Sequence, residues 1–121
     1  MSRLSLTPVS VKGPYDTVTA NSLDFVFTAA GASFADGAGF TLTGREVLIV
    51  RNGNVGAQTV TVTSVADDHN RTGDITAYSL GPNEYAVFPF FVLSGWQQTT
   101  GLLHIAASAA DVEFAVLRLP R

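Results

Sequence analysis

The 121-residue chain has no cysteine, one lysine and few charged residues of any kind. Without cysteine it forms no disulfide, offers no thiolate nucleophile and lacks the usual ligands of structural zinc, which is compatible with folding in a reducing cytosol. Its charged fraction of 14% is well below the roughly 25% typical of soluble domains. We therefore expect part of its apolar surface to lie against another chain instead of water.

Clustered positive charge is also missing. Lys12 and six arginines are spread along the chain, and the formal net charge is −3. A nucleic-acid surface needs a run or patch of basic side chains to displace counterions, so we expect no nucleic-acid partner. No apolar run is long enough to cross a membrane, and the first residues lack the apolar core of a signal peptide, so no membrane partner is expected.

Helical periodicity is hard to find, whereas short β-branched or aromatic runs recur about every ten residues between turn-forming residues. Val60 and Val62 alternate with threonines at 59, 61 and 63, which places the valines on an inner face and the threonines on an outer one. Further strands are expected at residues 23–28, 46–51, 74–80, 84–91, 102–108 and 112–119, with a weaker one at 3–11.

These strands, with short connections and no crossover helices, predict an all-β fold: an antiparallel, jelly-roll-like β-sandwich in one domain. The glycine- and asparagine-rich residues 52–57 predict a β-hairpin over residues 46–65. We assign residues 15–121 to the sandwich. Residues 1–14 contain too little pattern for a core strand and are expected to form an extended N-terminal arm.

Candidate catalytic residues are few. His69 lies in a polar loop and is expected to face solvent, whereas His104 alternates with apolar neighbours and is expected on the outer side of a strand. Neither is accompanied by a nucleophile motif, and the glycine-rich stretches match no phosphate-binding loop. The sequence therefore predicts no enzyme, no catalytic residue and no cofactor.

A loop at residues 68–73 partly matches the opening of a calcium-binding loop. The stretch Asp68-His69-Asn70-Arg71-Thr72-Gly73 has oxygen ligands at alternate positions and a glycine for the turn. Position twelve of such a loop is Ser79, which is not a bidentate carboxylate. An Asx-type turn is favoured and no metal site is assigned, although ion binding by this loop stays open. Asn70 also begins a glycosylation sequon, which carries little weight without a secretion signal.

Aromatic residues allow two interpretations. Tyr15, Phe34, Trp96 and the Phe88-Pro89-Phe90-Phe91 run are candidates for a sugar-stacking platform. The favoured alternative is that the phenylalanines fill the core, while Trp96 packs against a partner or against the end of the domain.

The order of four segments along the chain is also informative. "VKGPYDTVTANSLDFVFTAA" is followed by "TGREVLIVRNGNVGAQTVTVTSV", "RTGDITAYSLGPNEYAVFPFF" and "GWQQTTGLLHIAASAADVEFAVLRLP". This arrangement resembles a group of small bacteriophage virion proteins, the capsid decoration or cement proteins, in which a G-R-E-hydrophobic-R-N segment precedes an R-T-G-D strand and a final A-V-x-R-L strand.

The resemblance implies a β-sandwich or jelly roll made in the host cytoplasm, which binds the outside of the virion. Its implied partners are the major capsid protein and further copies of itself, commonly in a trimer. A receptor- or carbohydrate-binding module of a phage tail or fibre stays open as the alternative.

Interface residues follow from these expectations. We expect Arg45 and Glu46 to anchor the start of the hairpin through ionic hydrogen bonds, and Arg51 to hold the turn or a neighbouring subunit. Loop tryptophans and docking arms are typical interface anchors. The full set of expected contacts is Arg3, Leu4, Leu6, Tyr15, Arg45, Glu46, Arg51, Trp96 and Arg121.

Overall fold

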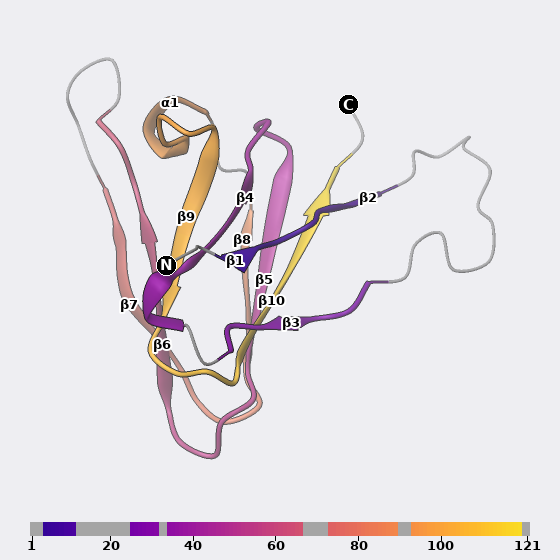
Figure 1. Cartoon of the computed structure of the whole chain (residues 1–121). Helices are drawn as coiled ribbons and strands as arrows, with labels where there is room; N and C mark the ends of the chain where they lie inside the picture. Colours follow the sequence, from indigo (N-terminus) through magenta and orange to yellow (C-terminus); the bar gives the residue numbers. More distant parts are fainter. Residues whose placement is uncertain (1–3, 12–24, 32–33, 67–72, 90–92, 120–121) are drawn as a thin grey trace.

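Two β-sheets packed face to face form the chain (Figure 1), which confirms the predicted all-β sandwich. The computed structural model describes residues 4–11, 25–31, 34–66, 73–89 and 93–119. The first sheet has the order β1 (Leu4–Ser5), β4 (Ala38–Thr41), β9 (Leu102–Ala107), β6 (Gln58–Thr63) and β7 (Ile75–Leu80). The second has the order β2 (Val9–Ser10), β10 (Val112–Arg118), β5 (Glu46–Asn52) and β8 (Tyr85–Pro89), with β3 (Thr28–Ala29) also pairing with β10.

The eight strands from β3 to β10 have the arrangement of a jelly roll. One sheet contains them in the order β3-β10-β5-β8 and the other in the order β4-β9-β6-β7. Consecutive strands therefore mostly cross from one sheet to the other, as in two interlocked Greek keys. Two short helical turns, η1 (Phe34–Asp36) and α1 (Leu93–Trp96), lie on such crossings.

The predicted hairpin over residues 46–65 is wrong. β5 pairs with β10 and β8, whereas β6 pairs with β9 and β7. The glycine-rich turn between them is an arch that carries the chain across the core. The facing pattern is nevertheless confirmed, because Val60 and Val62 are fully buried and Thr63 is exposed.

The core lies between the inner faces of the sheets. Period-two alternation supplies its side chains, since every second residue of a strand faces inward. In β5, Leu48 and Val50 are fully buried while their neighbours Val47 and Ile49 are half-buried. The largest fully buried side chains include Phe40, Leu42, Leu103, Ile105 and Phe114.

Residues 4–11 form a strap that closes one side of the sandwich. β1 runs parallel to β4 and β2 runs parallel to β10, so the sheets are mixed instead of purely antiparallel. Between these strands Leu6 enters the core, where its exposed fraction is 6%. This part of the predicted arm is extended but pairs with its own domain, and the expected boundary at residue 14 lies outside the described residues.

Three short elements, η1, β4 and α1, were not predicted from the sequence. β4 lies in a glycine- and alanine-rich stretch that resembled a turn, and its Ala38 and Gly39 are buried. α1 follows β8. In contrast, the strand expected over residues 23–28 is reduced to Thr28 and Ala29 in the part that the structure describes.

Candidate functional site

The outer face of the second sheet is the most unusual surface of the molecule. Three rows of outward side chains cross it. One row contains Leu117 and Val47, the next contains Ala115, Ile49 and Val87, and the third contains Glu113, Arg51 and Tyr85. We call the side chains of Val47, Ile49, Tyr85, Val87, Ala115 and Leu117 the apolar face.

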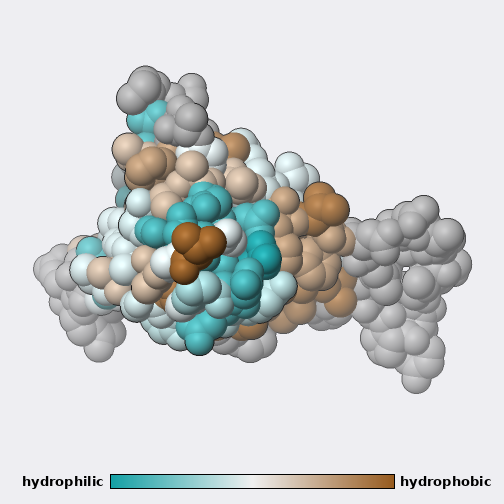
Figure 2. Space-filling view, turned by 90° about the horizontal axis from the view of Figure 1, so that it is seen from below, coloured by the Kyte–Doolittle hydropathy of each residue, from teal (hydrophilic) through white to brown (hydrophobic). Residues whose placement is uncertain are grey.

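Two of these side chains are open to solvent, whereas Val47, Ile49 and Leu117 are half-buried and Ala115 is buried. Val87 is 59% exposed and Tyr85 is 60% exposed, and the two lie in the edge strand β8. Beside β3, Phe25 and Val26 extend the exposed apolar surface at 40% and 82%. Seen from below, hydrophobic residues gather on the side where β3 extends (Figure 2). Exposed apolar residues that gather on one side of a protein are typical of an interaction site.

The outer face of the first sheet has the opposite character. Thr59, Thr61 and Thr63 line it on β6, and His104 faces the same side from β9, opposite Thr63. Antiparallel sheets commonly present such a polar face to water. The two outer faces of the sandwich therefore differ in character, and the second sheet has the more apolar one.

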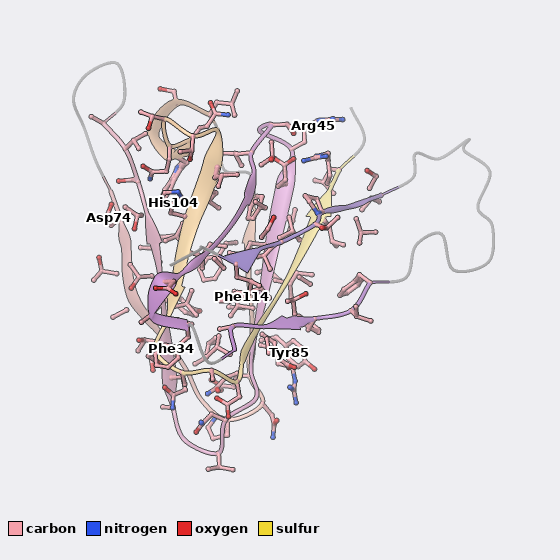
Figure 3. The ribbon with its side chains drawn as sticks, in the orientation of Figure 1. Phe34, Arg45, Asp74, Tyr85, His104 and Phe114 are labelled. Carbon is pink, nitrogen blue, oxygen red and sulfur yellow. The ribbon has the colours of Figure 1, made fainter. Side chains whose placement is uncertain are left out.

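An ionic and aromatic cluster borders the apolar face. Arg51 donates hydrogen bonds to Glu113 and to Asn83, and its guanidinium lies 5.9 Å from the ring centre of Tyr85. The hydrogen bond to Glu113 raises the pKa of Arg51. Tyr85 also packs against Phe27, with ring centres 5.9 Å apart, at the lower end of the sheet (Figure 3). The expected role of Arg51 at the turn thus takes the form of contacts that neutralise and rigidify one border of the face.

Glu46 lies inside the molecule, at the start of β5, with no exposed surface. Its carboxylate accepts hydrogen bonds from the Thr43 amide at 2.8 Å, the Thr43 hydroxyl at 2.6 Å and Nε of Arg118 at 2.5 Å. The amides of Gly44 and Arg45 point at the same carboxylate oxygen as the Thr43 amide. Glu46 therefore organises the turn between β4 and β5 and joins it to the last strand.

The electrostatics of Glu46 follow from these contacts. Burial alone raises the pKa of the carboxyl group. Hydrogen bonds from Thr43 and Arg118 outweigh burial, and they lower the pKa from 4.5 to about 2. The carboxylate is thus ionised at neutral pH and acts as a structural anchor.

Arg45 lies at the other end of the second sheet from Tyr85 (Figure 3). Its Nη1 donates a 3.3 Å hydrogen bond to the Leu119 carbonyl, and its Nε is buried without a hydrogen-bond partner in the structure. It therefore ties the β4–β5 turn to the end of β10.

The remaining expected interface residues have varied positions. Leu4 and Trp96 are half-buried, and each packs against the core of its own domain. Leu6 is part of the core itself. The other expected contacts and the loop candidates lie outside the described residues: Arg3, Tyr15, Arg121, and the residues from Asp68 to Thr72 with His69.

Asn52 is an important residue that sequence reasoning missed. It is fully buried at the end of β5, where its amide donates to the carbonyls of Gly56 and Leu80, both at 2.9 Å. Its side-chain oxygen accepts from the Asn54 amide at 2.9 Å. Asn52 thereby ties two inter-sheet arches together. An asparagine directly before a glycine was the available signal, but that pattern is typical of any turn.

No cluster of three potential metal-ligating side chains occurs in the described parts of the chain. None of the helices described there is long and apolar enough to cross a membrane. No protein-family model, curated protein or solved structure matches this chain.

Proposed function

We propose that this protein is a non-enzymatic structural component of a bacteriophage virion, which binds the outer surface of the capsid and stabilises the shell by bridging coat subunits. The proposal joins the ordered sequence segments, which resemble those of decoration proteins, to the jelly-roll sandwich, an architecture used by viral capsid and lectin domains. Fold alone does not determine function, so the surface carries the argument.

The observation that carries the proposal is the apolar outer face of the second sheet. Val87 and Tyr85 are each more than half exposed there, while the opposite face presents threonines. Exposed valine and tyrosine side chains gain free energy when a partner removes them from water, at about 25 cal/mol per Å² of apolar area. Such a surface suits a protein that works by association.

The mechanism is thermodynamic. A ligand that binds the assembled lattice but not the free subunits stabilises the lattice by RT ln(1 + [L]/Kd), about 2.7 kcal/mol per site at a hundredfold excess over Kd. Repeated over many sites, this free energy resists the internal pressure of packaged DNA. For this mechanism the protein needs only to be rigid and to fit the surface of the lattice.

Co-sedimentation with purified particles tests the proposal. The protein is expected to sediment with expanded capsids and to raise the temperature at which they disrupt, and to leave free coat subunits unbound. Equal binding to free subunits, or absence of binding to capsids at saturating concentration, contradicts the proposal.

One observation favours the alternative of a receptor- or carbohydrate-binding module. Tyr85 is an exposed ring with polar neighbours, Arg51 and Asn83, and aromatic rings of this kind bind the apolar faces of sugars. Glycan-array binding that is lost on Tyr85→Ala, with capsid binding absent, would favour this second function.

A further inference from the structure

We propose that the apolar face is the surface through which copies of this chain associate with one another. The inference rests on the proposed function, and it names the partner of one surface. Copies that associate through this face would form the unit that bridges coat subunits, and another part of that unit would contact the capsid.

The charge of the apolar face favours a second copy of the chain as its partner. In β5, β8 and β10 the charged side chains that face outward are Arg51 and Glu113, and these two form an ion pair with each other. The face is therefore electrically neutral. Two identical faces meet without like-charge repulsion, although the whole chain has a formal net charge of −3.

The composition of the apolar face favours a permanent partner. Interfaces that open and close are about as polar as the rest of a protein surface, whereas permanent interfaces between identical subunits are more apolar and resemble a core cut in half. The rows Leu117–Val47 and Ala115–Ile49–Val87 contain no polar side chain. A face of this composition fits a lasting partner better than a shell that the protein meets only after assembly.

The ionic and aromatic cluster at the border of the apolar face orients one copy relative to the next. Arg51 is held by Glu113, Asn83 and Tyr85, so its position is fixed before a partner arrives. Tyrosine and arginine are enriched among the residues that dominate binding energy, and rigid ones lose little entropy on docking. The ionic and aromatic cluster therefore fixes how one copy lies against the next, while Val87 and the half-buried side chains of the aliphatic rows add apolar area.

Light scattering and sedimentation equilibrium of the purified full-length protein, without capsids, test the inference. The wild-type protein is expected to be an oligomer. Val87→Lys places a charge in the contact and is expected to raise the dissociation constant about 100-fold or more. Val87→Thr keeps the branched shape and is expected to weaken association less. Thr63→Lys, at an exposed position on the opposite sheet, serves as the matched control and should leave the oligomer intact.

The outcomes separate the two proposals. A monomeric wild-type protein, or a Val87→Lys variant that is folded by circular dichroism and keeps the wild-type mass, overturns the inference. If Val87→Lys does not fold, the dissociation constant of the Val87→Thr variant decides: a value higher than that of the wild type supports the inference, and an unchanged value overturns it. Capsid binding is measured separately: a Val87→Lys monomer that still binds capsids through individually weak sites supports the inference. Loss of capsid binding by variants that remain oligomeric assigns the apolar face to the coat and overturns it.

Discussion

A single buried carboxylate shows how much of this fold depends on particular residues. Glu46 is in the interior, ionised, and in contact with the β4–β5 turn and with Arg118. From the sequence, Arg45 and Glu46 were expected to anchor the start of the hairpin through ionic hydrogen bonds, and both were counted among the interface residues. The structure gives Glu46 an ionic hydrogen bond inside the molecule, to Arg118, which is 72 residues away in sequence, and leaves it no exposed surface for a partner.

The first prediction concerns the pH dependence of stability. The folded-state pKa of Glu46, about 2, is lower than the value of 4.5 for an unperturbed carboxyl group. Its contribution is therefore fully present above pH 4.5 and is lost as the pH falls from 4.5 to about 2, with a total of about 3 kcal/mol in the free energy of unfolding. Urea titrations across this range should show a steeper loss for the wild type than for Glu46→Gln. Parallel curves for the two proteins would contradict the assignment.

At neutral pH the same substitution should be strongly destabilising. Glu46→Gln leaves the half-buried Arg118 guanidinium without its anion and replaces charge-assisted hydrogen bonds by weaker ones, at a cost of about 2–4 kcal/mol. Glu113→Gln is the control, since its partner Arg51 is part-exposed and keeps its contact with Asn83. The control should cost about 1 kcal/mol or less.

The strands show what the alternation of apolar and polar residues determines and what it leaves open. Alternation places Val60 and Val62 inside because the side chains of a strand alternate with a period of two. It does not determine which strand lies alongside, so the arch between β5 and β6 was predicted as a hairpin. Glycine and asparagine suit both kinds of turn. The apolar face was equally hard to predict: Val47, Ile49 and Val87 suit a core, and only the packing of the two sheets leaves them outside.

Replacement of Asn52 tests whether its buried side-chain amide stabilises the two inter-sheet arches. Asn52→Ala removes the donor from the carbonyls of Gly56 and Leu80, and a buried acceptor without a partner costs about 1–3 kcal/mol. Chemical denaturation should show a loss of about 2–3 kcal/mol in the free energy of unfolding, with unchanged slope. Asn54→Ala, whose side-chain contacts are exposed, is the control and should cost about 1 kcal/mol or less. Equal losses for the two variants would mean that the buried amide is unimportant.

The strap of residues 4–11 is expected to contribute to the stability of the sandwich. Two-residue strands give little sequence pattern, so residues 1–14 were expected to form an extended arm that contacts partners, with only a weak strand at residues 3–11. Because Leu6 lies in the core, Leu6→Ala should lower the free energy of unfolding by about 2–4 kcal/mol, whereas the exposed Ser5→Ala should change it little. An unaffected Leu6→Ala variant would show that the strap is dispensable for folding. For the same reason, deletion of residues 2–11 is expected to destabilise the sandwich as well as any contact with a partner.

The whole molecule is a sandwich with two unlike outer faces. One face presents threonines and His104, and the other presents aliphatic rows bordered by Arg51 and Tyr85. Low overall charge in the sequence predicted a buried surface somewhere, and the structure locates an apolar surface on the second sheet. The central claim is that this surface is covered when the protein is at work.

The most direct measurement is the accessibility of single cysteines, which the chain permits because it has none of its own. Val87→Cys and Thr63→Cys report on the two faces, and maleimide labelling is followed by mass spectrometry for the purified oligomer and for the protein bound to capsids. The Val87→Cys protein should be labelled much more slowly than the Thr63→Cys protein in the assembled states, and at a similar rate after dilution to monomers. Rapid labelling of Val87→Cys in both assembled states would contradict the account.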